Sequence, residues 1–371
     1  MTARVLFTGH AHAHVACFRP LYEYLRARGD VHVFVSGGLP MTSEGAGPPA
    51  RADVTDPMGM RLDPRAMARP FYIQQERVVT VEEMAGMDVD ILFASDTRML
   101  RPRSVGCHVQ LFPGLSFKSE AIRSSADAFF LVGPTMKRRL ATAGLLPAGD
   151  PRGLEIGAPW TDRLVDKSLE RDVLLRWYGL EGDRPILLYA PTGQPGNSLE
   201  LMGEEVLARL DETDRYLVLV KPHRKTPRRR TDWTARLRSY PWRNVVVLDD
   251  IDLIPLLHIS DLLITDASSI ASEYALLDRP MVFLDVPELV SRVVAAAGSE
   301  LDLASWARGA GTVIAGPEEV VRAVDNGLGH PRARSAVRRA TAADFFYNPG
   351  RATSAACAWL DRKLRRARTA A

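Results

Sequence analysis

The sequence predicts an α/β protein built from two doubly wound domains. Its 371 residues are enough for two domains that each bury a hydrophobic core. Short apolar runs alternate with helical patterns along almost the whole chain, and this alternation is typical of parallel sheets. The chain also opens with a strand at residues 4–8, a loop, a helical pattern and a second strand at 31–36, which is how a doubly wound domain begins.

The first half is predicted to contain six strands, which are marked by short apolar runs. They are expected at residues 4–8, 31–36, 90–95, 108–112, 128–132 and in the strand and turn at 153–160. The first strand is followed by a helical pattern that continues through Arg28, and Gly133-Pro134 opens another helix that Gly144 ends. The stretch 37–70 is rich in Gly, Pro and Met and lacks periodicity, so it is predicted to be a long excursion.

The second half repeats the alternation of strands and helices. Its strands are predicted at residues 185–190, 216–221, 244–248, 261–265, 281–285 and 312–315. A polar, charged stretch at 161–171 separates the two halves, and an amphipathic, very basic helix is predicted at 353–368. We therefore expect an N-terminal domain at 1–170, a C-terminal domain at 171–345 and a final helical segment at 346–371.

Composition and charge argue against several classes of protein. The formal net charge of +3 is too small to indicate a nucleic-acid partner. No apolar run approaches the ~20 residues that span a bilayer, and the first residues do not form a signal peptide. Three widely spaced cysteines, Cys17, Cys107 and Cys357, predict neither a disulfide framework nor a zinc ribbon, so a reducing cytoplasm is the expected compartment.

The stretch 261–277 joins a buried strand to the start of a helix. Its apolar run ends at Thr265, and Ser268 and Ser269 follow where the helical spacing begins. A helix start offers unpaired backbone N–H groups, and two hydroxyls beside it add donors, so this stretch predicts a phosphate site. The alternative is that these residues only cap the helix.

Three loops of the second half follow predicted strands and carry donors or cations. Thr192 follows the first of these strands, Lys221 and His223 follow the second, and the paired serines follow the fourth. Because the carboxyl ends of parallel strands meet at one edge, we expect the loops to gather there as a site for a diphosphate. Glu273, one helical turn beyond Ser269, is placed to accept hydrogen bonds from ribose hydroxyls; the alternative is a solvated helix residue.

Segments in both halves carry a resemblance to a known family. They are Val109–Lys118 (VQLFPGLSFK), Leu187–Thr192 (LLYAPT), Val220–His223 (VKPH), Ile264–Ile270 (ITDASSI), Ala275–Phe283 (ALLDRPMVF) and Phe345–Gly350 (FFYNPG). Together they resemble the CDP-glycerol glycerophosphotransferase family, whose members build or prime teichoic acid and related polyol-phosphate polymers. Since Thr265 and Asp266 lie in the ITDASSI segment, the resemblance implies that they bind the donor together with Ser268 and Ser269.

The resemblance implies the GT-B arrangement, in which two Rossmann-like domains face a cleft. The C-terminal domain is expected to hold the nucleotide-diphosphate donor, the N-terminal domain to present the acceptor, and the final helix to cross back to the N-terminal domain. The implied reaction is attack of an acceptor hydroxyl on the β-phosphate of CDP-glycerol, which expels CMP. His223 and Lys221 are implied to neutralise or protonate the diphosphate, and Thr192 to add a hydrogen bond.

One position departs from the family pattern. Where members usually carry His-Gly, with the histidine as the expected general base, this chain has Pro113-Gly114, and proline cannot accept a proton. Either another histidine substitutes, or the reaction differs, or the protein does not catalyse it. His14, on the first loop after a strand, is the candidate substitute, ahead of His10 and His12, because an imidazole readily accepts a hydroxyl proton near neutral pH.

His10, His12 and His14 alternate along the chain in a way that also suits metal ligands. No acidic or cysteine partner lies close in sequence and no HExxH motif is present, so we predict no metal site. We expect no cofactor besides the CDP-activated donor.

Other functions on the same scaffold stay open, because a fold does not determine the transferred group. The alternatives are a nucleotide-sugar glycosyltransferase and, because of Pro113, a nucleotide-binding protein without catalysis. The basic run at 225–230 and the basic final helix fit a polymeric or lipid-linked acceptor and an anionic membrane surface. The expected location is therefore cytoplasmic, peripheral at the inner face of the cell membrane.

Overall fold

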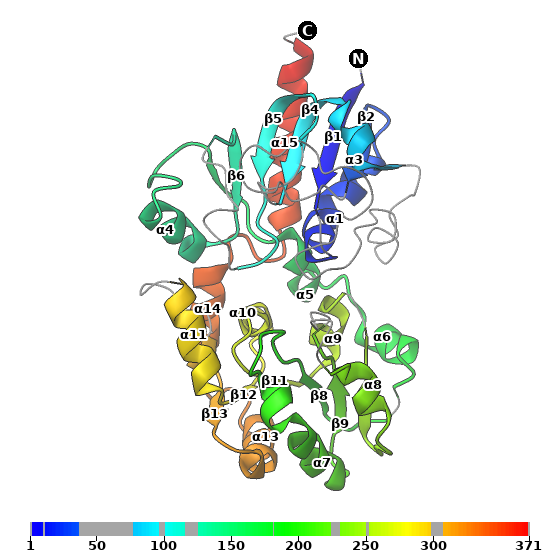
Figure 1. Ribbon diagram of the computed structural model, residues 1–371, viewed down its shortest axis with the longest axis vertical. Helices are drawn as coiled ribbons and strands as arrows, with labels where there is room; N and C mark the ends of the chain where they lie inside the picture. The colour runs from blue at the N-terminus through cyan, green and yellow to red at the C-terminus, as the bar shows by residue number, and fades with distance from the viewer. Residues whose placement is uncertain are drawn as a thin grey trace. The chain divides into compact units, whose positions relative to one another are not determined.

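The computed structural model divides the chain into two compact units, which Figure 1 shows with their sheets. Unit 1 comprises Met1–Asp162 and Asp344–Ala371, and unit 2 comprises Arg163–Ala343. The structure describes residues 2–9, 12–36, 77–95, 101–115, 125–180, 182–223, 231–249, 252–297 and 307–369.

Unit 1 is built on a seven-stranded parallel sheet. Its strands, in the order β3-β2-β1-β4-β5-β6-β7, are Val78–Val79, Val31–Ser36, Ala3–Thr8, Asp88–Ala94, Ser104–Gln110, Ala128–Leu131 and Gly153–Glu155. At the carboxyl end of β1, Thr8 is in register with Ser36 on one side and Ala94 on the other. The chain order of the strands reverses between β1 and β4, and this is where doubly wound sheets bind ligands.

The helices of unit 1 are α1, α3, α4 and α15, with a short 3-10 helix η4, and the helix α5 begins at the last residue of its first segment and continues into unit 2. Their bounds are His12–Arg26, Val81–Ala85, Pro134–Thr142, Ala352–Thr369, Pro159–Thr161 and Asp162–Val165. The last helix, α15, belongs to this unit because it packs on α1, where Tyr24 Oη donates to Asp361 Oδ2 at 2.8 Å. Phe130 on β6 also contacts Trp359 edge to face, with ring centroids 5.2 Å apart.

The segment before α15 is fastened to the sheet of unit 1 by backbone contacts. The amide of Tyr347 donates to the carbonyl of Val132 at 2.7 Å. Gly157, at φ +100°, lies so close to the Tyr347 carbonyl that a Cβ there would be 2.1 Å from its oxygen. Both the backbone conformation and the close approach therefore require glycine at this position.

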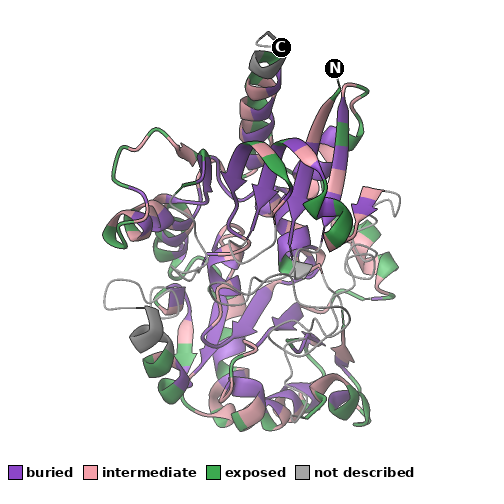
Figure 2. Cartoon of the chain, turned by 45° about the horizontal axis from the view of Figure 1, so that its top comes forward, coloured by how far each residue is buried: buried purple, intermediate pink, exposed green. Residues whose placement is uncertain are grey.

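Unit 2 is built on a six-stranded parallel sheet. Its strands, in the order β10-β9-β8-β11-β12-β13, are Val245–Val247, Leu217–Val220, Ile186–Tyr189, Leu262–Thr265, Met281–Leu284 and Thr312–Ile314. Here the chain order reverses between β8 and β11, where Leu188 is in register with Leu263. Every residue of β8, β11 and β12 is buried (Figure 2), as expected for parallel strands covered on both faces.

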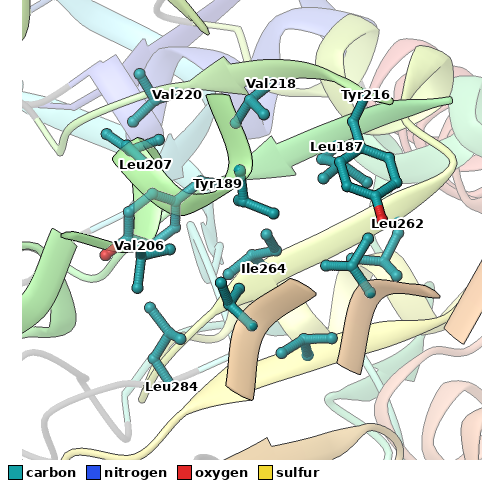
Figure 3. Close-up of a cluster of buried hydrophobic side chains, with 14 of the residues drawn as sticks. Leu187, Tyr189, Val206, Leu207, Tyr216, Val218, Val220, Leu262, Ile264 and Leu284 are labelled. Atoms are coloured by element: carbon teal, nitrogen blue, oxygen red, sulfur yellow. The ribbon is translucent and has the colours of Figure 1, made fainter. Parts of the chain in front are cut away.

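Helices connect the strands of unit 2. They are α6 (Arg171–Trp177), η5 (Leu199–Gly203, a π-helix), α7 (Glu204–Glu212), α8 (Trp233–Arg238), α9 (Ile254–Ile259), α10 (Ile270–Ala275), α11 (Pro287–Ala297), η6 (Pro317–Glu319), α13 (Val320–Gly329) and α14 (Ser335–Phe345). Figure 3 shows the core on one face of the sheet, where Val206 and Leu207 of α7 meet Tyr189 and Ile264. This core anchors β8, β9 and β11, the three strands whose carboxyl ends carry the predicted motifs.

The predicted fold class is confirmed, since both sheets are parallel and helices connect their strands. All twelve predicted strands are present, while β3 was not predicted because two residues are too short to show a pattern. The first helix begins at His12 and ends at Arg26, so His14 lies in its first turn and not, as predicted, on the preceding loop. The whole of the predicted excursion at 37–70 and residues 116–124 lie outside the described residues.

Candidate functional site

The predicted motifs of unit 2 meet at the carboxyl edge of its sheet. Thr192 follows β8, Lys221 follows β9 and Asp266 follows β11, and β8 is hydrogen-bonded to both of the other strands. The edge between β8 and β11 is the point where strand order reverses, which is where doubly wound sheets bind ligands. The structure thus brings the three predicted loops together in one unit.

Asp266 and Thr265 tie the loop after β8 to the end of β11. Thr192 N donates to Asp266 Oδ1 at 2.9 Å, and the Thr265 hydroxyl donates to the carbonyl of Ala190 at 2.7 Å. Both side chains are 0% exposed. Each of these two side chains is enclosed and bonded to the loop, and their predicted contact with the donor stays a prediction.

The Asp266 carboxylate has an unusual electrostatic environment. Burial raises the pKa of this carboxyl above its ordinary value, and the hydrogen bonds from Ser198 and Thr192 offset part of that effect. Burial and the nearby Asp266 also raise the pKa of Tyr189, whose hydroxyl lies 2.8 Å from Ser198 Oγ. Tyr189 therefore stays neutral and supports Ser198 with a hydrogen bond from inside the core.

Lys221 and His223 lie beside the loop that follows β8. Lys221 is 7% exposed, and its amide donates to the carbonyl of Tyr189 at 2.9 Å. His223 is exposed, and its ring packs on Gly193, where a Cβ would be 2.5 Å from Nδ1. Glycine at 193 therefore permits the loop and the imidazole to approach each other closely.

Ser268 and Ser269 lie immediately before α10. Ser269 is its N-cap residue but has helical backbone angles, φ −63° and ψ −16°, and its side chain makes no capping hydrogen bond. Ser269 therefore does not cap the helix through its side chain. Both side chains are partly exposed, and neither hydroxyl has a hydrogen-bond partner among the residues that the structure describes. They are available as donors, whereas the six-residue α10 has few aligned peptide dipoles to add.

Glu273 lies in α10, one turn beyond Ser269, and is partly exposed. Its predicted contact with ribose hydroxyls stays a prediction. The neighbouring Ser272 is fully buried, so Glu273 is on the outer side of this short helix.

His14 lies at the carboxyl edge of the sheet in unit 1. It is 8% exposed, and a Cβ on Gly9, directly after β1, would be 2.4 Å from its Cβ and 3.3 Å from Nδ1. One turn along α1, Cys17 Sγ lies 3.5 Å from the carbonyl of Phe112, the residue before Pro113. The helix that carries His14 therefore packs against the loop in which the family base is missing.

Other predicted residues fall partly outside what the structure describes. His10, the side chain of His12 and the basic run at 225–230 are not described. Pro113 and Gly114 are partly exposed after β5. Across the described ranges, no group of three or more His, Cys, Asp or Glu side chains is placed to hold a metal ion.

Several residues of the site were not predicted. Gly193, Ser198 and Tyr189 support the donor loop, and the Gly and Pro residues between 191 and 196 were the signal that a shaped turn lay there. A hollow of about 590 Å³ also lies between η5 and α8 and is lined by Glu204, Trp233 and Arg236. It holds none of the predicted donor residues.

Comparisons with known proteins identify a relative by sequence. The chain is 33% identical over 134 residues to the teichoic acid glycerol-phosphate primase of Bacillus spizizenii, a match that covers 35% of this chain and 33% of the primase. The matched segment thus spans about a third of the length of this curated relative.

Two solved structures share the fold. The wall teichoic acid polymerase TagF, in a structure soaked with CDPG, matches with a TM-score of 0.66 at 15% identity, over 98% of this chain and 89% of that chain. The UDP-GlcNAc 2-epimerase of Neisseria meningitidis matches with a TM-score of 0.58 at 13% identity, over 98% of this chain and 100% of that chain.

A family model covers the whole of unit 2 and adjoining parts of unit 1. The model for CDP-Glycerol:Poly(glycerophosphate) glycerophosphotransferase matches residues 117–357, which is more than half of the chain and includes every predicted donor residue. This protein belongs to the CDP-glycerol:poly(glycerophosphate) glycerophosphotransferase family.

Proposed function

We propose that this protein transfers a glycerol-phosphate or similar polyol-phosphate group from a CDP-activated donor to a hydroxyl acceptor, releasing CMP. The product is a teichoic-acid-like polymer of the cell envelope. The observation that carries the proposal is the gathering of Thr192, Lys221, His223 and the paired serines at the carboxyl ends of the adjacent strands β8, β9 and β11 in unit 2. The likeness to a glycerol-phosphate primase and membership of the family support the choice of transferred group.

The donor half of the reaction follows from the charges at this edge. A diphosphate requires fixed donors and cations, and Lys221 supplies a cation while Ser268, Ser269 and Thr192 supply hydroxyls. In the transfer, the acceptor oxygen forms a bond to the β-phosphorus, and the bond from that phosphorus to the bridging oxygen breaks. CMP leaves with the bonding electron pair, and His223 stabilises or protonates it.

The acceptor half needs a general base. His14 is the proposed base, because it lies at the carboxyl end of β1 and its helix contacts the residue before Pro113. It takes the proton of the acceptor hydroxyl as the new bond to phosphorus forms. The residues above supply each of these roles without a cofactor; addition of a chelator such as EDTA tests whether a metal contributes.

Nucleotide release distinguishes the proposed reaction from its two alternatives. The purified protein is incubated with CDP-glycerol or with UDP-sugars, with and without a polyol-phosphate acceptor. Acceptor-dependent release of CMP supports the proposal. Release of UDP from a UDP-sugar instead shows a glycosyltransferase, and binding of CDP-glycerol without any release shows a protein that has lost catalysis.

Replacing either Ser268 or Ser269 with Ala is expected to raise KM for CDP-glycerol about 10-fold. Each hydroxyl has no partner within the described residues, so its loss removes a hydrogen bond to the charged donor without disturbing the fold. Ser239→Ala is the matched control, since within the described ranges the Ser239 hydroxyl bonds the carbonyl of Arg236 at the end of α8. Unchanged KM in both serine variants contradicts the assignment.

We also propose that the protein works at the cytoplasmic face of the membrane as a peripheral protein. The described residues contain no helix of the length and apolar character that a membrane span requires. Arg362 and Arg365 are exposed on α15 and suit an anionic surface. Sedimentation with phosphatidylglycerol vesicles, but not with phosphatidylcholine vesicles, is expected; equal recovery with both contradicts the proposal.

A further inference from the structure

The Asp266 carboxylate closes the loop that follows β8. Thr192 N donates to Oδ1 at 2.9 Å, Ser198 N donates to Oδ2 at 2.9 Å, and the Ser198 hydroxyl donates to the same oxygen at 2.8 Å. Thr192 and Ser198 stand near the two ends of this loop, so one side chain holds both ends. Asp266 and Ser198 are 0% exposed, which places these bonds in an environment where hydrogen bonds are strong.

The loop held in this way borders the residues that we assign to the donor. Its Gly193 packs on the ring of His223, where an added Cβ would be 2.5 Å from Nδ1. Thr192 carries one of the proposed donor hydroxyls. A displacement of the loop therefore moves Thr192 and removes the surface against which the His223 ring rests.

The negative charge of Asp266 also argues against a direct contact between its side chain and the donor. A carboxylate that faced a diphosphate directly would repel it. Asp266 is instead enclosed, and the donors it binds belong to the loop. Burying a carboxylate costs free energy unless it is hydrogen-bonded. Here its two oxygens accept hydrogen bonds from N–H groups at both ends of the loop.

We propose that Asp266 is a positioning residue: it clamps the loop from Pro191 to Ser198 in the shape that presents Thr192 and His223 to a nucleotide diphosphate. The clamp itself is independent of the reaction, whereas its effect on the donor rests on the proposed function. A side-chain amide cannot replace the carboxylate, because its NH2 group would face either Thr192 N–H or Ser198 N–H.

The chain offers a matched control at the opposite end of the same strand. Asp261 precedes β11, and its Oδ2 accepts from Ile186 N at 2.8 Å and from Arg171 Nη2 at 2.9 Å. It joins the start of β11 to the start of β8, as Asp266 joins their ends. Asp261→Asn therefore disturbs the same pair of strands without touching the carboxyl edge.

Hydrogen–deuterium exchange of the full chain without ligand tests the clamp directly. In Asp266→Asn, peptides covering residues 190–198 are expected to exchange at least ~10-fold faster than in the wild type, because one of the two amides loses its acceptor and faces the new NH2 group instead. In Asp261→Asn these peptides are expected to exchange at the wild-type rate. If Asp266→Asn does not fold, Ser198→Ala removes one of the three bonds and is expected to accelerate exchange of the same peptides less.

Titration with CDP then tests the effect on the donor site. We expect the Kd for CDP to rise about 10- to 100-fold in Asp266→Asn and to be unchanged in Asp261→Asn, with KM for CDP-glycerol following Kd. Wild-type exchange at 190–198 in the folded Asp266→Asn variant overturns the clamp, as does equal loosening of this loop in Asp261→Asn. A wild-type protein that binds no CDP overturns the proposed donor instead, and the exchange result still decides the clamp.

Discussion

Replacing His223 with Ala is expected to lower kcat/KM for acceptor-dependent CMP release at least ~100-fold. The leaving CMP carries the negative charge that develops as the bond to the β-phosphorus breaks, and an imidazole that donates to it stabilises the transition state. His223 is exposed at the carboxyl end of β9 and is oriented by its contact with Gly193. Steady-state kinetics with CDP-glycerol at saturating acceptor measure the loss.

His330→Ala is the control for this variant. His330 is also exposed, but it ends α13 and its ring bonds the carbonyl of Asn326, so its loss is expected to leave kcat/KM unchanged. Turnover of His223→Ala close to that of the wild type contradicts our assignment of the donor site. Wild-type melting of both proteins shows that any loss comes from the chemistry and not from unfolding.

Replacing His14 with Ala is expected to lower kcat about 100-fold or more while leaving the Kd for CDP unchanged. A general base contributes ~10²–10⁴-fold to the transfer step, and it does not contact the nucleotide. His14 is the described histidine at the carboxyl end of β1, where the order of strands in unit 1 reverses. Single-turnover kinetics with separate CDP titration measure the two quantities independently.

The control for His14 is His32→Ala, because His32 is an exposed histidine on β2 of the same unit. Since His14 is mostly buried, His14→Gln is measured as well, to keep the side-chain volume while removing the base. A normal kcat in either folded His14 variant shows that another group accepts the proton. A rise in the Kd for CDP shows instead that His14 supports the fold.

The strands of unit 2 were predictable because each one is marked by an apolar run in its own residues. The apolar run predicted as a strand at 261–265 is continuous, as expected for a parallel strand buried on both faces, and β11 is Leu262–Thr265. The loops after such strands meet at one edge, so the positions of Thr192, Lys221 and Ser268 followed from the strands alone.

The partners of Asp266 were not predictable from the same information. Thr192 and Ser198 are 74 and 68 residues away in sequence, and they meet Asp266 only because β11 pairs with β8. A local sequence pattern does not report the order of strands in a sheet or how deeply a side chain is buried. Thr265 and Asp266 were therefore expected at the donor, although their side chains are buried beneath the loop.

The first unit shows a related limit. The histidines after β1 fit a loop by sequence, but α1 begins at His12, so His14 belongs to a helix and packs on Gly9. Where no strong capping residue precedes a helix, the sequence pattern does not define the first residue of the helix to better than about one turn.

A crystal structure of this protein soaked with CDP-glycerol is the most direct test of the donor site. We expect the diphosphate at the carboxyl ends of β8, β9 and β11, with its oxygens within hydrogen-bond distance of the hydroxyls of Ser268 and Ser269 and of Lys221 or His223. The glycerol end is expected to point away from Asp266. A diphosphate bound elsewhere, such as in the hollow between η5 and α8, contradicts the account.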